Sequence, residues 1–304
     1  MQTIIHPIEK HLIKQELSSD KFIRHTNKQQ NEIYEINAHN SPNIMKEIGR
    51  LREIAYREVG SGTGKEADID ALDTAEHPYT QLIIWDPREE LILGGYRYKT
   101  GWNATNQEGK IELGTARLFK YSDHFVQNML PITIELGRSF IRPEFQSTAE
   151  SRRAIFTLDN LWDGLGSLIV RFPQIKYFFG QVSIYKNYDR LARDLVLYYL
   201  SIYFPDPDGI IQAHEPLPLL HSKEELSTII LGNDKTEDYK RLSKEVRKRG
   251  EAIPPLINSY MNISPSMKTF GTVDNPYFFN MEDTGILITI ADIYPEKKDR
   301  HLTY

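Results

Sequence analysis

Segments with strand and helix periodicity alternate along this chain of 304 residues, and their order limits the folds that it can adopt. Residues 80–86 and 91–101 alternate as two strands of a hairpin around Pro87–Glu90. Further strands are predicted over residues 31–38, 131–142, 176–184 and 284–293. Helices with an apolar stripe are predicted over residues 41–59, 149–172 and 187–204. A run of strands followed by this alternation predicts a mixed α/β sheet flanked by helices.

The domain organisation follows from composition along the chain. Residues 1–30 are polar and basic with weak periodicity, which is typical of an N-terminal arm. Residues 31–304 then form a single predicted domain. Prolines cluster between 205 and 218, and a charged helix over 236–250 follows them. We therefore interpret residues 205–250 as a helical, proline-rich insertion in that domain.

Composition excludes several classes of function. The chain has no cysteine, which excludes disulfides, thiolate nucleophiles and cysteine-based metal sites. Its net charge of −5 gives no reason to expect nucleic acid as a partner. No apolar run approaches the ~20 residues of a membrane span. We expect a cytoplasmic protein without a metal ion, with peripheral contact at the inner membrane as an additional expectation.

Charged residues interrupt the predicted strand 131–142, where Glu135 and Arg138 lie among Ile and Leu. In a regular strand they would point to opposite faces, whereas a bulge near Gly137 would change that. One interpretation is that both residues form structural ion pairs. The other is that they are a general base and an anchor for an anion or carbonyl group. The residues alone leave both open.

The segment "EADIDALD" places Asp68, Asp70 and Asp73 in an acidic loop. The spacing of a calcium loop is missing, so a solvated loop is the simpler interpretation. The alternative is that these carboxylates bind the ammonium group of an amine substrate. The preceding "GSGTGK" is not a phosphate loop, because a helix precedes it and Glu66 follows Lys65.

Five segments in this order resemble a known family: "EADIDALD", "LILGGYRY", "ITIELGRSFIRPEF", "KYFFGQVSI" and "PPLINSYMNISPSMKTFGTVDNPYFFN". The chain resembles the bacterial ornithine-lipid-type N-acyltransferases, also called hemolysin-like, over roughly residues 45–290. These enzymes belong to the GNAT superfamily. The acyl-homoserine-lactone synthases are more distant relatives with a similar acidic loop and a similar Glu–x–x–Arg strand.

The resemblance implies transfer of a fatty acyl group, 3-hydroxylated or plain, from a thioester to the α-amine of glycine, ornithine or lysine. It implies that Glu135 is the general base and that Arg138 acts beside it. Asp70, Asp73, Arg97 and Ser139 would form the substrate-binding site, with the aspartates paired to Arg97 or Arg138. A tyrosine would protonate the departing thiolate, for which Tyr188 is the candidate and Tyr185 its neighbour.

The expected donor is an acyl-phosphopantetheine thioester on acyl carrier protein, with acyl-CoA less favoured. The stretch "RPEFQSTAESRRA" contains no glycine, whereas a diphosphate is normally held by glycine-rich amides at a helix start. No permanently bound cofactor is expected. Two alternatives stay open: a signal synthase of the acyl-homoserine-lactone type, and a non-catalytic protein that binds acyl carriers or lipids.

Overall fold

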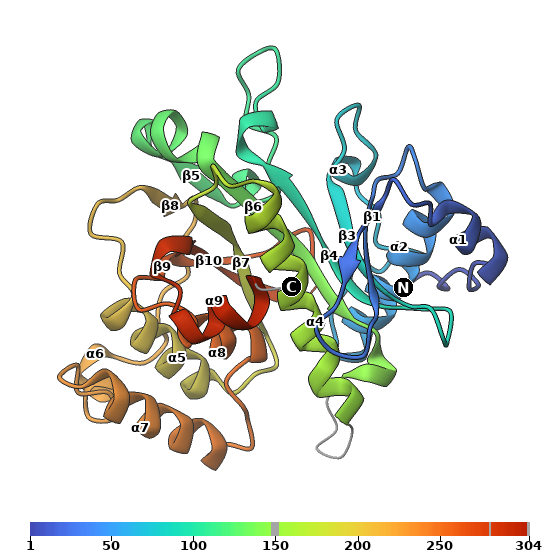
Figure 1. Cartoon of the computed structure of the whole chain (residues 1–304). Helices are drawn as coiled ribbons and strands as arrows, with labels where there is room; N and C mark the ends of the chain where they lie inside the picture. Colours follow the sequence, from blue (N-terminus) through green and yellow to red (C-terminus); the bar gives the residue numbers. More distant parts are fainter. Residues whose placement is uncertain (147–151, 280, 303–304) are drawn as a thin grey trace.

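A mixed α/β sheet with helices on both faces forms the centre of the molecule (Figure 1). The computed structural model describes residues 1–146, 152–279 and 281–302. Within these ranges the main sheet has eight strands in the order β1-β2-β3-β4-β6-β7-β10-β9. Their bounds are β1 (Phe22–His25), β2 (Glu32–Ile36), β3 (Thr80–Asp86), β4 (Leu91–Thr100), β6 (Thr133–Ile141), β7 (Tyr177–Tyr185), β9 (Lys268–Asp274) and β10 (Met281–Thr289). The predicted fold class is confirmed.

One strand pair differs from the others, because β6 and β7 are parallel while all other neighbours in this sheet are antiparallel. Their pairing covers only Thr133–Leu136 of β6 and Tyr177–Gly180 of β7. At the last pair a Cβ on Gly180 would lie 2.7 Å from the Leu136 carbonyl oxygen, so this close approach requires glycine. Beyond it, residues 137–141 and 181–185 are not paired with each other. We call these two segments the unpaired ends.

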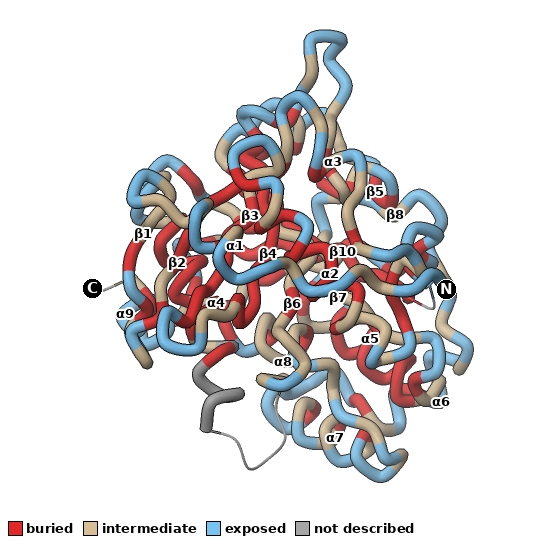
Figure 2. Tube along the Cα trace, turned by 90° about the vertical axis from the view of Figure 1, so that its right-hand side faces the viewer, coloured by how far each residue is buried: buried red, intermediate tan, exposed pale blue. Residues whose placement is uncertain are grey.

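Helices cover the sheet on both sides. They are α1 (Lys10–Glu16), α2 (Pro42–Glu58), α3 (Ala71–Thr74), α4 (Arg152–Arg171), α5 (Arg190–Tyr203), α6 (Lys223–Ser227), α7 (Lys235–Lys248), α8 (Pro255–Met261) and α9 (Pro295–Leu302). The largest apolar core lies between the sheet and α4, α5 and α8, which we call the helical face. On the opposite face α2 packs on one part of the sheet, and a second small sheet of β5 (Phe119–Tyr121) and β8 (Ile211–Ala213) packs on another. Figure 2 shows the buried central strands beneath exposed loops.

Most predicted elements are present within two or three residues of their expected bounds. The hairpin is β3 and β4, and the strand with the charged interruptions is β6. One region differs from prediction. Residues 1–30 are not a separate arm, because they form α1 and edge strand β1 of the main sheet. Residues 205–250, the predicted helical insertion, contain β8, α6 and α7, whose Leu226 and Val246 join the largest core.

Candidate active site

A β-bulge in β6 brings the two charged residues of this strand to one face of the sheet. Gly95 of β4 pairs with Phe140 and Arg97 pairs with Gly137, so β6 has one extra residue between these points. Arg138 takes up this extra length with φ +52°, a left-handed conformation that is uncommon outside glycine. Arg138 consequently joins Glu135 on the face opposite the helical face. We call this face of the sheet the polar face.

Three arginines and three aspartates form a buried network on the polar face. Arg97 Nη1 lies 2.8 Å from Asp70 Oδ1 and 3.0 Å from Asp73 Oδ1. Arg138 Nε lies 3.1 Å from Asp68 Oδ2, and its Nη2 lies 3.6 Å from Asp70 Oδ2. The predicted pairing of the acidic loop with these arginines is therefore present. The third arginine, Arg52, comes from α2 and lies 3.5 Å from Asp73.

Local sequence explains why the acidic loop adopts this shape. Asp70 caps α3 and forms a capping box with Asp73. Each of the two carboxylates accepts a hydrogen bond from the backbone amide of the other residue. Burial alone would raise the pKa of Asp70, but the charges of Arg97 and Arg138 outweigh it and hold this pKa well below its usual value. The arginines thus hold the pKa values of Asp70 and Asp73 below their usual range, whereas burial raises the pKa of Asp68 despite the charges of Arg138 and Arg52.

Glu135 is buried beside this network, with 3% of its surface exposed. Oε1 accepts hydrogen bonds from the amide of Thr115 at 2.8 Å and from its hydroxyl. Oε2 accepts from the Tyr79 hydroxyl and, at 3.4 Å, from the Gly114 amide. The Gly114 amide also donates to Tyr79 Oη at 2.9 Å, so its bond to Glu135 is the weakest of the four. Gly114, whose amide contacts Oε2, is itself partly exposed.

The other predicted site residues lie at different depths. Ser139 is partly exposed in the unpaired end of β6, and its carbonyl oxygen accepts from Tyr56 Oη at 3.0 Å. Tyr188 packs in the core of the helical face, where its hydroxyl donates to the Ala252 carbonyl at 2.9 Å. Tyr185 is partly exposed at the end of β7. The roles of Ser139 and Tyr188 stay predictions.

Sequence reasoning missed a carboxylate on the neighbouring strand. Asp283 of β10 is 1% exposed and lies between Gln181 and Ser183, which belong to the unpaired end of β7. The predicted strand began at residue 284, so this aspartate was left outside it. A detectable signal was an acidic residue at the start of the long apolar run "GILITI".

The glycine-rich loop at residues 60–65 has a structural role. Glu53 of α2 accepts hydrogen bonds from the amides of Thr63 and Gly64 at 3.0 and 2.8 Å. These amides are the groups that a phosphate would need. The segment between β6 and α4, in which no diphosphate site was predicted, includes residues 147–151 and so lies partly outside the described residues.

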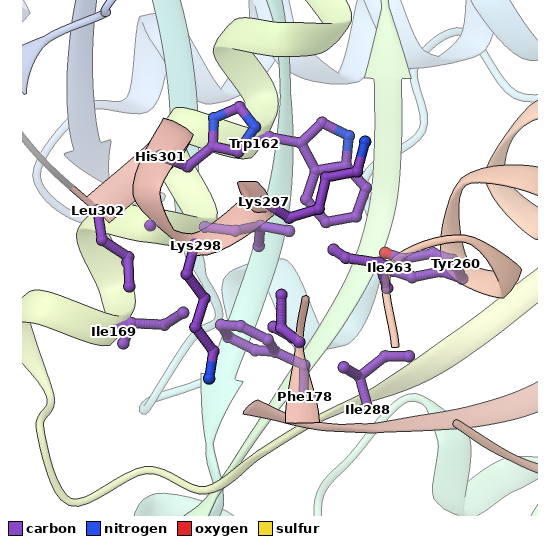
Figure 3. Close-up of a pocket in the computed structure, with 13 residues that line it drawn as sticks. Trp162, Ile169, Phe178, Tyr260, Ile263, Ile288, Lys297, Lys298, His301 and Leu302 are labelled. Carbon is purple, nitrogen blue, oxygen red and sulfur yellow. The ribbon is translucent and has the colours of Figure 1, made fainter. Parts of the chain in front are cut away.

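An apolar pocket lies on the helical face, between α4, α8, α9 and the sheet (Figure 3). Its cavity volume is about 30 Å³, within a wider space of about 440 Å³ that is partly open to solvent. Trp162 and Ile169 of α4 line it with Phe178 of β7, and Lys297 and Lys298 of α9 complete its wall. Phe178 pairs with Ile134, two residues before β6 and β7 stop pairing.

Among the described helices, none is both long and apolar enough to cross a bilayer.

Comparison with known proteins gave three kinds of match. Residues 51–154 match the acetyltransferase (GNAT) domain family. The glycine N(alpha)-acyltransferase of Bacteroides thetaiotaomicron is 50% identical over 303 residues, which are 99% of this chain and 90% of that protein. That of Phocaeicola vulgatus is also 50% identical over 303 residues, covering 99% and 93%. A CoA-dependent acyl-homoserine lactone synthase has a TM-score of 0.42 and 11% identity, over 88% of this chain and 86% of that one.

Proposed function

This chain belongs to the family of GNAT-domain acyltransferases that includes the two glycine N(alpha)-acyltransferases, and on that basis we propose that it acylates the α-amine of glycine. The chain is an N-acyltransferase with a mixed, GNAT-like sheet. The observation that carries the choice of glycine is the 50% identity to both relatives along almost the whole chain.

The reaction joins the glycine nitrogen to the thioester carbonyl carbon and breaks the carbon–sulfur bond. The ammonium group loses two protons, of which one reaches the leaving thiolate and one is released. We assign removal of the first proton to Glu135, through the Oε2 side that faces the partly exposed Gly114. Tyr185 or Tyr188 is the candidate donor to the thiolate, and Tyr185 is the one on the polar face.

We assign different roles to Arg97 and Arg138, because their side chains differ in exposure to solvent. Arg97 is 4% exposed and is held by Asp70 and Asp73, so it positions the acidic loop. The Arg138 side chain is 14% exposed and stacks over Phe278 at 4.0 Å from the ring centre. We assign Arg138, with the neighbouring Ser139, to the carboxylate of the acceptor, because a guanidinium binds a carboxylate with two parallel hydrogen bonds.

The acyl chain would lie in the apolar pocket on the helical face. Between the unpaired ends the sheet has no backbone hydrogen bonds, so a thioester can pass from one face to the other there. The amine would then approach on the polar face while the hydrocarbon tail contacts Trp162 and Phe178. This arrangement removes the tail from water, which favours binding by roughly 0.8 kcal/mol per buried methylene.

We assign the donor to acyl carrier protein, an acidic partner that would dock beside the unpaired ends. Helix α7 carries six basic and three acidic residues, and exposed Lys240, Lys244, Arg247 and Lys248 line one surface hollow. The residues after α7 contact the turn that follows β7. Arg249 lies 3.4 Å from Asp189, and Tyr188 donates to Ala252. Helix α7 thus flanks the end of β7.

The test is acyl transfer by the purified protein. Acyl carrier protein and CoA thioesters of one fatty acid would each be offered with glycine, ornithine or lysine, and the products identified by mass spectrometry. N-acylglycine formed at the highest rate from the carrier-protein thioester is the expected result. Acylation of ornithine or lysine instead, or of a sulfonium-containing methionine derivative, would contradict the proposed acceptor.

A further inference from the structure

Asp283 is a buried carboxyl group that accepts hydrogen bonds only from neutral groups among the described residues. Its carboxylate accepts hydrogen bonds from Gln181 Nε2 at 2.6 Å, Ser183 Oγ at 2.5 Å and Asn275 Nδ2 at 2.5 Å. It forms no ion pair within 4.0 Å in the described part of the chain. A buried carboxylate without a cation is costly, and such positions in enzymes often serve a ligand.

The charged groups around Asp283 leave this carboxyl group without a cation in contact. Asp68, Asp70 and Asp73 are matched by three arginines in the network described above. Glu135 and Asp283 are further carboxylates on the same face, and neither has an arginine or lysine partner within 4.0 Å among the described residues. Lys99 lies opposite Glu135 on β4 and acts on it electrostatically, and Arg117 acts on Asp70. Asp283 is thus a carboxylate of this face without a cation within 4.0 Å among the described residues, which favours binding of a positively charged group there.

An unused acceptor lies next to Asp283. Gln181 donates its Nε2 to Asp283, and its Oε1 is buried without a hydrogen-bond partner in the part of the chain that the structure describes. Most buried polar atoms have a hydrogen-bond partner, so a buried oxygen without one is a candidate to accept a hydrogen bond from a ligand. The amide geometry keeps Oε1 close to the Asp283 carboxylate. One ammonium group can donate to both oxygens, because it has three hydrogens.

The position of this pair matches the acceptor side of the reaction. Gln181 and Ser183 belong to the unpaired end of β7 and are partly exposed. Arg138 acts on Asp283 electrostatically from across the unpaired ends. Glu135 pairs with Phe179, two residues before Gln181, so it lies ~7 Å along the strands from that level. A proton from an ammonium group bound there would reach Glu135 through bridging water rather than directly.

We propose that Asp283 and Gln181 Oε1 bind the ammonium group of the amino-acid acceptor while Arg138 faces its carboxylate. This inference rests on the proposed function, since it assigns the acceptor subsite of the same reaction. Burial raises the pKa of the Asp283 carboxyl in the unliganded protein, although Ser183, Asn275 and Arg138 oppose the shift. A bound ammonium would supply the missing positive charge.

Asp283→Asn tests the inference with little change of shape. Asparagine keeps all three contacts, because Oδ1 accepts from Gln181 and Asn275 while Nδ2 donates to Ser183 Oγ. We expect the KM for glycine to rise at least about tenfold, with the KM for the acyl donor unchanged and kcat at saturating glycine largely retained. Asp208→Asn is the control, because that carboxylate is 69% exposed and pairs with Lys268 at the surface.

Gln181→Met is the second variant, which removes the orphan oxygen while keeping the chain length. It should also raise the KM for glycine, by several-fold, and it decides the question if Asp283→Asn does not fold. A glycine KM within about twofold of wild type in the folded variants would overturn the inference. A loss of kcat with unchanged KM would also overturn it. Wild type that transfers no acyl group to glycine would overturn the proposed function and this inference together.

Discussion

Two buried carboxylates on the polar face differ in the donors that surround them. Glu135 accepts from two backbone amides and two hydroxyls, which fix the loop at Gly114 and Thr115. Asp283 accepts only from side chains of its own face. A carboxylate fixed by backbone amides keeps its position during a reaction, whereas one held by side chains can adapt to a ligand. This difference supports assigning the base to Glu135 and the ammonium site to Asp283.

Glu135→Gln should lower kcat by roughly 10²–10⁴-fold, which is the usual contribution of a general base. The fold should persist, because glutamine still accepts from Thr115 and donates to Tyr79 Oη. Single-turnover rates with saturating thioester and glycine would measure the effect, alongside the melting temperature. Glu112→Gln in the same loop is the control, since the Glu112 carboxylate accepts a hydrogen bond only from Asn106 among the described residues and does not contact Glu135. Wild-type turnover in Glu135→Gln would refute its role as base.

Asp283→Asn should raise the melting temperature at neutral pH, because it removes an unpaired buried charge. The folded pKa of Asp283 is raised above the unfolded value of about 3.9, so wild type gains stability relative to the variant as pH falls through this folded pKa. Arg138 and Asp274 also act on this carboxyl, but both are present in the two proteins. Melting curves from pH 8 to pH 4 would measure the difference. We expect it to shrink on acidification, and a widening difference would contradict the assigned shift.

At the scale of elements, the bulge in β6 decides which residues meet. The sequence predicted β6 and its charged pair, because apolar periodicity identifies strands. It left the face of Arg138 open, because bulges depend on register with β4 rather than on local pattern. Asp283 escaped prediction for the same reason, since its partners Gln181 and Ser183 lie about 100 residues away. Edge strand β1 was missed because its four residues have no clear alternation.

Arg138→Met should destabilise the protein by several kcal/mol, on the order of 3–5, because it leaves the fully buried Asp68 without its closest cation. Methionine has the same backbone cost at φ +52°, so the comparison isolates the guanidinium. The double variant Asp68→Asn with Arg138→Met should recover much of this loss. Urea denaturation would give the free energies of unfolding. Lys186→Met, whose ion pair is exposed, should cost at most about 1 kcal/mol. Equal losses in the single and double variants would contradict the argument.

At the scale of the whole molecule, the proposed binding mode places the two substrates on opposite faces of the sheet. Charged groups gather on the polar face, and the apolar pocket lies on the helical face. If the acyl chain occupies that pocket, Ile169→Phe should reduce transfer of long acyl chains more than that of short ones, by about tenfold or more. Val170→Phe is the matched control, because Val170 is next in α4 but 48% exposed. Relative rates with a series of acyl lengths would measure this, and an unchanged profile in Ile169→Phe would place the chain elsewhere.

Charge on α7 should govern the choice between carrier protein and CoA. Lys240 and Lys248 pair with glutamates of the same helix, whereas Lys244 and Arg247 form no ion pair with any described residue. These two charges are therefore free to attract an acidic partner, and reversing them would repel it.

The double variant Lys244→Glu with Arg247→Glu should raise the KM for the carrier-protein thioester roughly tenfold or more at low salt, with the KM for acyl-CoA changed far less. The effect should shrink as salt is added, because exposed charges are screened. Lys110→Glu with Lys120→Glu makes the same change in net charge at two other exposed lysines. Lys120 belongs to β5, which lies at the upper left of Figure 1, whereas α7 lies at the lower left. Equal effects of the two double variants would show that the change in KM comes from net charge and not from a docking surface on α7. Unchanged kinetics in the α7 variant would place the docking surface elsewhere.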